Sequence, residues 1–587
     1  MAFFKGAFLI FFGFFFCLPL SLKLILPQDR SLTQVSSACF GLSIGFLTLF
    51  MAYLATFYKP WFNLQDILIS LLLIFLLLSV LLLRKGTSFP SQKAEVSGSV
   101  GPPFLDHLLK GSIGIVCLFI FWDSVYYPFI TQDAITHYAL PAKNIFLAGG
   151  MDGFHVPQIK GVLGTYPLLV PLSYAYNYFA FGEINEHAAK VIPGLFSIGL
   201  IGSTYLLGKH LYNKKIGLFA ALLLSFSPLF LKYATSGYTD IPGAFFYTNS
   251  ILYYWLTYRY RSMKYAILTG LMVGFSIWTK NSTLLIFISI LLFFIIQTLI
   301  DQLRKTEGYI HLHHLVFILV ISLAIGGPWY LRNYLLFGYL VPVGWVYNKF
   351  WMDYGVPMFK YFGVIGYHVS IVYVFGLFYG FSRLFGKDTK ILFLLSFVLP
   401  YLMVWVLKFS IDPRFLLMIL PLFAVLGIVA IEECFQKKYE IFAQKKLLAL
   451  ILVGVLIFPH IVYVTAKNRD LFLHPFISDD EKRMKKMKRF YPLVLYFKDI
   501  QSKGEGDIRI IAPDKRLLYF LGPQMVSSEY PMKMDQLKNF DYFVCPLAFR
   551  IYNLAPKGNE ISANLSNEKY FVNVFESGGN VIYKIVH

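Results

Sequence analysis

Charged residues are scarce in this 587-residue chain. Asp, Glu, Lys and Arg make up 14% of the sequence and hydrophobic residues 57%, which is far from the usual balance of a soluble domain. Apolar stretches such as 64–83 are as long as a membrane-spanning helix requires. The composition therefore excludes a soluble protein and predicts a polytopic α-helical membrane protein.

Cysteines and nucleotide-binding motifs offer little chemistry. The five cysteines have neither metal-ligand spacing nor the pattern of a disulfide framework: Cys17, Cys39, Cys117, Cys434 and Cys545. No nucleotide-binding loop is present, which argues against a bound aqueous nucleotide sugar. The net charge of +20 would suit nucleic acid, but the basic residues lie mostly in short loops between apolar segments, where they set orientation. We therefore expect membrane lipids, and no nucleic acid, as partners.

About fourteen segments are apolar enough to cross a bilayer. They are 3–26, 34–57, 64–83, 111–130, 190–208, 216–232, 241–258, 265–279, 282–300, 314–333, 364–382, 391–408, 415–432 and 446–465. The first lacks a clear cleavage site and has only Lys5 as a basic residue, so it is expected to be a retained span and not a signal peptide.

Basic loops predict the orientation. Six of them fall on one side of these spans, at 84–110, 209–215, 259–264, 304–305, 383–390 and 437–446, and that side is expected to be cytoplasmic. Residues 1–107 then form three N-terminal spans and a cytoplasmic linker, 108–465 a core of about eleven spans, and 466–587 an extracytoplasmic domain. The predicted location is the cell (inner) membrane, with the active site outside.

Two regions outside the membrane have structure of their own. In the outer loop 131–189, the segments 134–147 and 166–181 are predicted to be helices on the membrane surface. The tail has short β-type runs at 508–512, 542–545 and 581–585, which predict a small α/β domain of about 120 residues. Asp514-Lys-Arg516 within it is predicted to be a turn.

Asp133 and His137 are the first candidates for catalysis. Residues four apart share a helix face, so both side chains would point toward one volume above the bilayer. A carboxylate can take a proton from an attacking hydroxyl, and an imidazole can orient it. Asp240, at the start of a span on the same face, is a further candidate. The alternative is that Asp133 and Asp240 simply cap helices.

Three cations lie on the same face. Lys280, Arg332 and Arg414 could hold a lipid phosphate and neutralise it as it leaves, or they could anchor lipid headgroups or pair with the nearby carboxylates. Further candidates for substrate binding are Asn281, Asn333, Tyr166 and His155, although His155 also suits an ordinary loop.

Metal binding is left open by the sequence. Asp133, His137 and Asp240 could hold Mg²⁺ or Mn²⁺, but no second acidic residue stands beside Asp133, because Ala134 follows it.

In this order, these segments resemble the GT-C superfamily of polyprenyl-phosphate-dependent glycosyltransferases, which contains the protein O-mannosyltransferases and the aminoarabinose transferase of lipid A. The resemblance covers 108–465 and rests on Asp133, Tyr138-Ala-Leu-Pro-Ala-Lys143, Tyr166-Pro-Leu, Ser227-Pro228, Asp240, Gly274 to Lys280, Pro328-Trp-Tyr-Leu-Arg-Asn-Tyr334 and Pro413-Arg-Phe-Leu-Leu417. Where some relatives have a second acidic residue and Glu-Lys-Pro-Pro, this chain has Ala134 and Thr165-Tyr-Pro-Leu168.

The resemblance implies a function and roles for these residues. Asp133 would be the catalytic or acceptor-positioning carboxylate, Asp240 would support it, and Lys280, Arg332 and Arg414 would serve the phosphate. The expected reaction is inverting transfer of a sugar from a polyprenyl-phosphate donor to a glycan, lipid or protein acceptor in the cell envelope. The alternatives are a flippase or transporter of lipid-linked saccharides, and an O-antigen polymerase or ligase.

Overall fold

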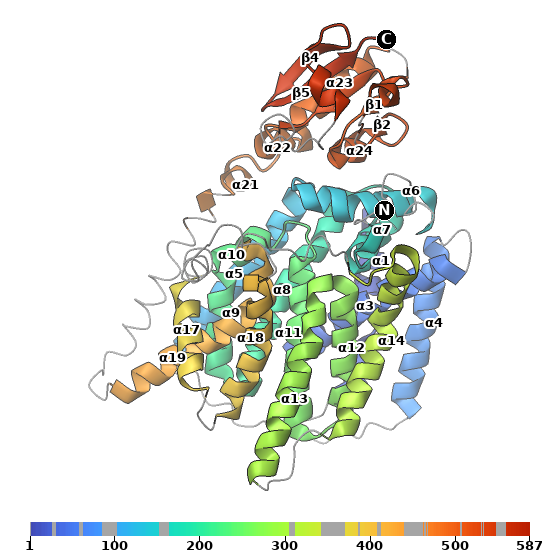
Figure 1. The fold of residues 1–587 in the computed structure, drawn as a ribbon. Coiled ribbons are helices and arrows are strands. Elements are labelled where there is room, and N and C mark those ends of the chain that lie inside the picture. The colour runs from blue at the N-terminus through green and yellow to red at the C-terminus, as the bar shows by residue number, and fades with distance from the viewer. Residues whose placement is uncertain are drawn as a thin grey trace.

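The computed structural model has two parts, a broad layer of helices and a small α/β domain above it (Figure 1). It describes residues 2–25, 31–57, 63–84, 103–151, 164–304, 311–341, 370–384, 388–407 and 412–438, and in the C-terminal region 462, 465–466, 468–504, 507–529, 531, 533–547 and 559–587. His155, almost all of the expected span 446–465 and, apart from Pro103, the expected linker at 87–103 lie outside these residues.

The N-terminal helices pack against the core. They are α1 (Ala2–Phe15), α2 (Leu18–Leu24), α3 (Leu32–Phe57) and α4 (Leu64–Arg84). The first expected span is interrupted after Phe15, where α2 begins with Pro19 in its first turn. Aromatic contacts join these helices to the rest of the layer: Phe40 of α3 lies 4.9 Å from Phe196 and 5.9 Å from Phe245, measured between ring centroids.

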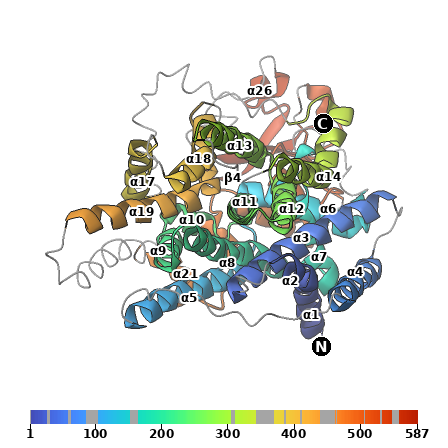
Figure 2. The same ribbon diagram turned by 90° about the horizontal axis from the view of Figure 1, so that it is seen from below.

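The core helices follow the expected spans closely. They are α5 (Pro103–Tyr126), α8 (Glu186–Leu211), α9 (Lys214–Ser225), α10 (Pro228–Tyr233), α11 (Asp240–Tyr260), α12 (Met263–Thr279), η6 (Asn281–Leu284), α13 (Leu285–Arg304), α14 (Leu312–Phe337), α17 (Ile371–Ser382), α18 (Thr389–Leu407), η8 (Pro413–Met418) and α19 (Leu420–Lys438). One expected span, 216–232, is divided into α9 and α10, because Pro228 starts a new helix. Helix α11 lies at the centre (Figure 2) and is buried on all sides from Asp240 to Tyr258.

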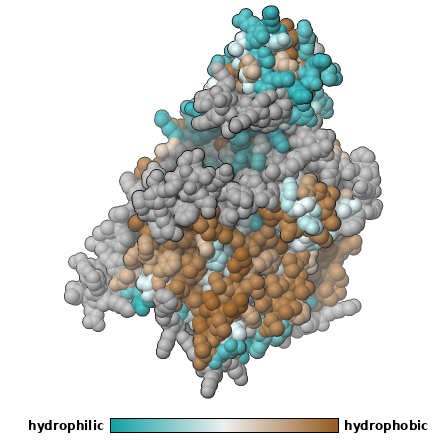
Figure 3. Space-filling view, viewed as in Figure 1, coloured by the Kyte–Doolittle hydropathy of each residue, from teal (hydrophilic) through white to brown (hydrophobic). Residues whose placement is uncertain are grey.

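On the face seen in Figure 3, the described part of the helical layer is apolar, whereas the domain above it is largely hydrophilic. Exposed side chains such as Ile288 and Ile295 of α13 and Val320 of α14 contribute to this surface. Among the described residues, eight helices are long and apolar enough to cross a membrane. Burying so much apolar surface requires lipid, so the chain is an integral membrane protein.

The segment after α5 lies between the helical layer and the C-terminal domain. It forms the π-helix η2 (Ala134–Ala139), then α6 (Leu140–Ala148) and α7 (Leu169–Phe181), and α6 runs across the top of the layer in Figure 1. The end of α6 is as predicted, because Gly149 adopts a left-handed conformation there with φ 64°. A helix is present within the predicted range 166–181, but its predicted position on the membrane surface is wrong. Helix α7 is buried in protein, against α1, α3, α6 and α8.

The C-terminal domain contains the expected small sheet. Its strands are β1 (Ile510–Ile511), β2 (Val526–Ser527), β3 (Tyr542–Cys545), β4 (Phe571–Ser577) and β5 (Asn580–Ile585), in the order β2-β1-β3-β5-β4. Strand β1 pairs in parallel with β2 and β3, and β5 pairs antiparallel with β3 and β4. The helical elements of this region are α21 (Arg469–Leu473), α22 (Asp479–Lys486), α23 (Tyr491–Ser502), α24 (Lys515–Leu521), η9 (Met534–Leu537) and α26 (Glu560–Asn564). Cys17, Cys39, Cys117, Cys434 and Cys545 are free in the structure.

Candidate functional site

Two carboxylates and two cations meet at one end of the core helices. We call Asp133, Asp240, Lys280 and Arg414 the ion-pair cluster. Asp133 directly precedes η2, Asp240 is the first residue of α11, Lys280 follows the last residue of α12, and Arg414 lies in η8. Each therefore stands at the end of an element, where the chain turns and a polar side chain can leave the apolar interior.

Asp133 is held by Arg414. Nη1 of Arg414 lies 2.6 Å from Oδ2 of Asp133, a charge-assisted hydrogen bond between residues far apart in sequence. Asp133 has helical backbone angles and caps no helix with its side chain, so the capping alternative is wrong for this residue. About 32% of its side chain remains exposed, which leaves the carboxylate accessible to a substrate.

Asp240 is buried and paired with Lys280. Nζ of Lys280 donates to Oδ1 of Asp240. Only 11% of the Lys280 side chain and 3% of the Asp240 side chain are exposed. Lys280 also lies over the ring of Phe415, 4.8 Å from its centroid. A buried charge needs such partners, so the pair explains how a lysine can stand between two apolar helices.

Arg414 connects the two halves of the cluster. Its Nε lies 3.9 Å from Oδ1 of Asp240 and 3.7 Å from Oδ2 of Asp412. Although burial opposes its charge, the neighbouring carboxylates Asp240, Asp133 and Asp412 outweigh this and raise the pKa of Arg414. Nε itself has no hydrogen bond among the described residues.

Aromatic rings line the cluster, and the three described next were not among the site residues predicted from the sequence. The guanidinium of Arg414 lies 5.1 Å from the ring centroid of Tyr238 and 5.4 Å from that of Phe415. Tyr138 lies behind them and shares a 2.9 Å hydrogen bond with the hydroxyl of Thr239. Their positions next to the charged residues were the available signal, since Phe415 follows Arg414 and Tyr238 stands two residues before Asp240.

His137 lies beside the cluster as a neutral base. Its Nδ1 is 2.6 Å from the hydroxyl of Thr136, which itself donates to the carbonyl of Gln132. This arrangement suits the tautomer with its proton on Nδ1. Burial lowers the pKa of His137, Lys515 and Arg414 lower it further, and Asp133 opposes them. The ring lies 5.5 Å from that of Tyr166, between centroids. Among the described residues Nε2 has no hydrogen-bond partner, and in this tautomer it can accept a proton or a hydrogen bond.

Arg332 and Asn333 contact the polypeptide next to Tyr166. Arg332 donates to the carbonyl of Gly164 at 3.0 Å, and Asn333 donates to that of Thr165 at 3.1 Å. Within the described residues, neither of them forms a hydrogen bond or ion pair with the ion-pair cluster. Both side chains hold the segment that leads to Tyr166. The guanidinium carbon of Arg332 also lies 4.4 Å from the ring centroid of Trp329.

Two further candidates are Asn281 and His155. Asn281 accepts a hydrogen bond of 3.2 Å from the hydroxyl of Tyr330, so its amide joins η6 to α14. His155 lies outside the described residues.

The donor set does not suit a divalent metal. Cations already engage both carboxylates of the cluster, Arg414 at Asp133 and Lys280 at Asp240. In the part of the chain that the structure describes, no group of three or more His, Cys, Asp or Glu side chains could hold a metal ion. The positive charge that this site can offer a substrate comes from Arg and Lys.

Part of the core matches a known protein family. The model of the dolichyl-phosphate-mannose-protein mannosyltransferases matches residues 167–325, a segment that contains Asp240 and Lys280. A comparison with curated protein sequences finds no significant match.

Solved structures with a similar fold cover most of the chain. ArnT from Cupriavidus metallidurans, bound to undecaprenyl phosphate, is 12% identical with a TM-score of 0.54, over 81% of this chain and 98% of ArnT. The Archaeoglobus fulgidus oligosaccharyltransferase AglB, in complex with an inhibitory peptide and a dolichol-phosphate, is 13% identical with a TM-score of 0.53, over 82% and 75%. The same enzyme with Zn and sulfate is 14% identical with a TM-score of 0.53, over 81% and 73%.

These similarities show a shared fold. The ArnT and AglB structures have the GT-C fold, and the family model matches part of the same helical core. The chain therefore has the GT-C fold, and the resemblance seen in its sequence is confirmed at this level.

Proposed function

We propose that this protein is a membrane glycosyltransferase that transfers a sugar from a polyprenyl-phosphate donor to a glycan, lipid or protein acceptor on the extracytoplasmic face. The observation that carries the proposal is the pairing of the accessible Asp133 with Arg414, beside the buried pair of Asp240 and Lys280. The family model and the lipid phosphates named with ArnT and AglB support it.

Asp133 would act as the general base. An acceptor hydroxyl attacks the anomeric carbon of the sugar, its proton passes to Asp133, and the bond from that carbon to the carrier oxygen breaks. The electron pair of this bond leaves with the polyprenyl phosphate. Attack opposite to the leaving group inverts the anomeric centre. His137, whose Nε2 has no hydrogen-bond partner among the described residues, would orient the same hydroxyl.

The cations would stabilise the departing phosphate. Negative charge grows on the carrier oxygen as its bond to the sugar breaks, and fixed positive charges nearby stabilise that state. Arg414 is the best placed, because it contacts the accessible carboxylate. Lys280 is more deeply buried and would act through Asp240 by holding Arg414 in position.

A comparison of cell-envelope glycans tests the proposal. Mass spectrometry would be applied to glycolipids, glycans and glycoproteins from cells without the gene and from cells complemented with the wild type, Asp133→Asn or Asp66→Asn. Asp66 is a matched control, since it also stands in the first turn of a helix and is in no ion pair within the described residues. We expect one sugar to be lost in cells without the gene. The wild type and Asp66→Asn should restore this sugar, and Asp133→Asn should not. Restoration by Asp133→Asn removes Asp133 from the mechanism, and unchanged glycans overturn the proposal.

The same experiment separates the other classes. A flippase would leave a complete lipid-linked saccharide accumulating when the gene is lost. A polymerase or ligase would change the number of repeat units or their attachment, with no single sugar missing from the unit.

A further inference from the structure

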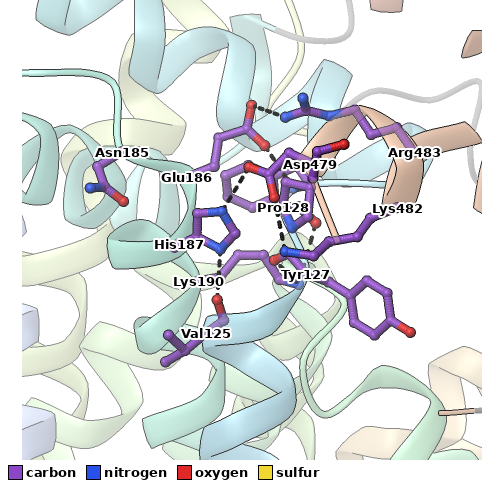
Figure 4. A network of polar contacts seen from close by, with 12 residues as sticks. Val125, Tyr127, Pro128, Asn185, Glu186, His187, Lys190, Asp479, Lys482 and Arg483 are labelled. Carbon is purple, nitrogen blue, oxygen red and sulfur yellow. Dashed lines mark hydrogen bonds and ion pairs between the residues drawn. The ribbon is translucent and has the colours of Figure 1, made fainter. Parts of the chain in front are cut away.

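The C-terminal domain is tied to the membrane core by buried ion pairs (Figure 4). Nη2 of Arg483, on α22, lies 2.9 Å from Oε1 of Glu186 at the start of α8, and 12% and 13% of the two side chains are exposed. The other oxygen of Glu186 accepts from the backbone N–H of Phe129 at 2.8 Å. Burial opposes the charge of Arg483, but Glu186 outweighs it and raises the pKa of the guanidinium.

A second group of contacts in Figure 4 lies beside the first. Nε2 of His187 is 2.8 Å from Oδ2 of Asp479, and Lys482 donates to Oδ1 of Asp479 at 3.0 Å. Burial would raise the pKa of Asp479, but these two hydrogen bonds outweigh it and hold the pKa below its ordinary value. The domain is therefore held in a defined position on the core.

This attachment extends to α24, which packs against η2. The hydroxyl of Tyr519 donates to Oε1 of Glu186 at 2.9 Å, and Lys143 of α6 donates to the carbonyl of Tyr519 at 2.6 Å. Because η2 carries His137, these contacts place α24 next to the candidate site.

Lys515 is the first residue of α24, and its charge is not neutralised. Arg516 occupies both oxygens of the adjacent Asp514, with Nε at 3.0 Å from Oδ1 and Nη2 at 2.5 Å from Oδ2. Lys515 is half-buried, and among the described residues it has no hydrogen bond or ion pair. Its charge nevertheless reaches His137, whose pKa it lowers.

The ion-pair cluster lacks such a free cation. Lys280 is engaged by Asp240 and Arg414 by Asp133, so a phosphate must compete with a carboxylate for either of them. Lys515 could bind a phosphate without breaking an existing pair. Partial burial limits the hydrogen bonds that the Lys515 ammonium group can form with water. A bound phosphate would supply hydrogen bonds in their place.

We propose that Lys515 of the C-terminal domain binds a substrate phosphate beside His137, so that this domain forms part of the substrate site. The inference rests on the proposed function. The shared chemistry is a phosphate monoester or diester, which could belong to the lipid carrier or to the acceptor.

Binding of undecaprenyl phosphate by the full-length protein in nanodiscs tests this, with undecaprenol as the uncharged probe. The proteins are the wild type, Lys515→Ala, Lys515→Arg and, as a control, Lys538→Ala, which changes an exposed lysine of the same domain. Losing one charged hydrogen bond weakens binding by about tenfold or more. Lys515→Ala should bind undecaprenyl phosphate more weakly by that factor, whereas its binding of undecaprenol should not change. Lys515→Arg should keep most of the affinity for undecaprenyl phosphate, and Lys538→Ala should match the wild type.

A second measurement identifies the source of the phosphate. If inorganic phosphate competes with undecaprenyl phosphate for the wild type but not for Lys515→Ala, then Lys515 binds the phosphate of the lipid carrier. If inorganic phosphate binds through Lys515 without displacing undecaprenyl phosphate, then Lys515 binds a phosphate of the acceptor. If Lys515→Ala equals the wild type with both probes, the inference about Lys515 is overturned. If the wild type does not distinguish undecaprenyl phosphate from undecaprenol, the proposed function itself is overturned.

Discussion

Asp133 and Arg414 are 281 positions apart in the sequence, yet Oδ2 of the carboxylate and Nη1 of the guanidinium are 2.6 Å apart. The contact joins the start of the segment outside the helical layer to η8, near the end of the core. Arg414 also faces Asp240 and Asp412, so one side chain holds three acidic residues at a single place. This arrangement suits a reaction in which a proton is taken up and a phosphate departs.

The buried pair of Asp240 and Lys280 should stabilise the fold as a unit. Replacing one partner leaves the other charge buried without its closest partner, which costs about 3–5 kcal/mol. Asp240→Asn and Lys280→Met should each lower the thermal unfolding temperature in detergent, followed by tryptophan fluorescence. The double variant Asp240→Asn/Lys280→Met should recover most of the loss, because no unpaired charge remains. Equal losses that simply add in the double variant would contradict the pairing.

Glu186 should control the attachment of the C-terminal domain. Glu186→Gln leaves Arg483 without its buried carboxylate, at a cost of about 3 kcal/mol. Hydrogen exchange in α22 and α24 should then accelerate by roughly a hundredfold, while exchange in α11 stays unchanged. Glu183→Gln is the control, since Glu183 is exposed and three residues earlier. Unchanged protection of α24 in Glu186→Gln would show that other contacts hold the domain.

The activity of the protein should decline only in mild acid. Burial, Lys515 and Arg414 lower the pKa of His137 below its ordinary 6.5, with Asp133 opposing. A lowered pKa means that neutral imidazole persists at and above pH 6.5 and is lost only as the pH falls through the lowered value. The transfer rate should therefore stay constant from about pH 8 to 6.5, the ordinary pKa of histidine, and fall below it.

Lys515→Met checks the cause of that shift. Removing one nearby positive charge should raise the pKa of His137, so the fall in rate should begin at a higher pH than in the wild type. His137→Gln should remove this part of the profile. A decline that stays at the same pH in both variants would assign it to another group.

Transfer activity should survive removal of divalent metals. Arg414 and Lys280 occupy the carboxylates that a metal would need. EDTA treatment of the purified protein should leave the rate within about twofold, since loss of a bound catalytic metal would cost several kcal/mol. Inactivation by EDTA, followed by recovery with Mg²⁺ or Mn²⁺, would show that a metal enters the site.

Much of the fold could be predicted, because the bilayer makes simple demands. Apolar stretches of span length predicted α3, α4, α13 and α18 with small errors at their ends. The β-type runs at 542–545 and 581–585 correspond to β3 and β5. Strand β4 was missed, although Phe571, Val572, Val574 and Phe575 are residue types that favour a strand.

The site was predicted only in part. Charged residues next to apolar spans drew attention to Asp133, Asp240, Lys280 and Arg414, because a charge at that place needs a partner. Lys515 could not be found in this way, since the predicted turn Asp514-Lys-Arg516 has the composition of many surface turns. Its importance depends on the neighbouring Asp514–Arg516 pair and on where α24 rests.

The sequence by itself determined that the chain lies in a membrane, roughly where its helices run, and which charged residues stand at their ends. These follow from hydropathy and length, which act locally along the chain. Only the tertiary structure decided which charges meet: Arg414 with Asp133, Lys280 with Asp240, and Arg332 with the backbone of Gly164. Ion pairs form between whichever side chains helix packing brings within a few ångströms, and that proximity depends on the whole fold.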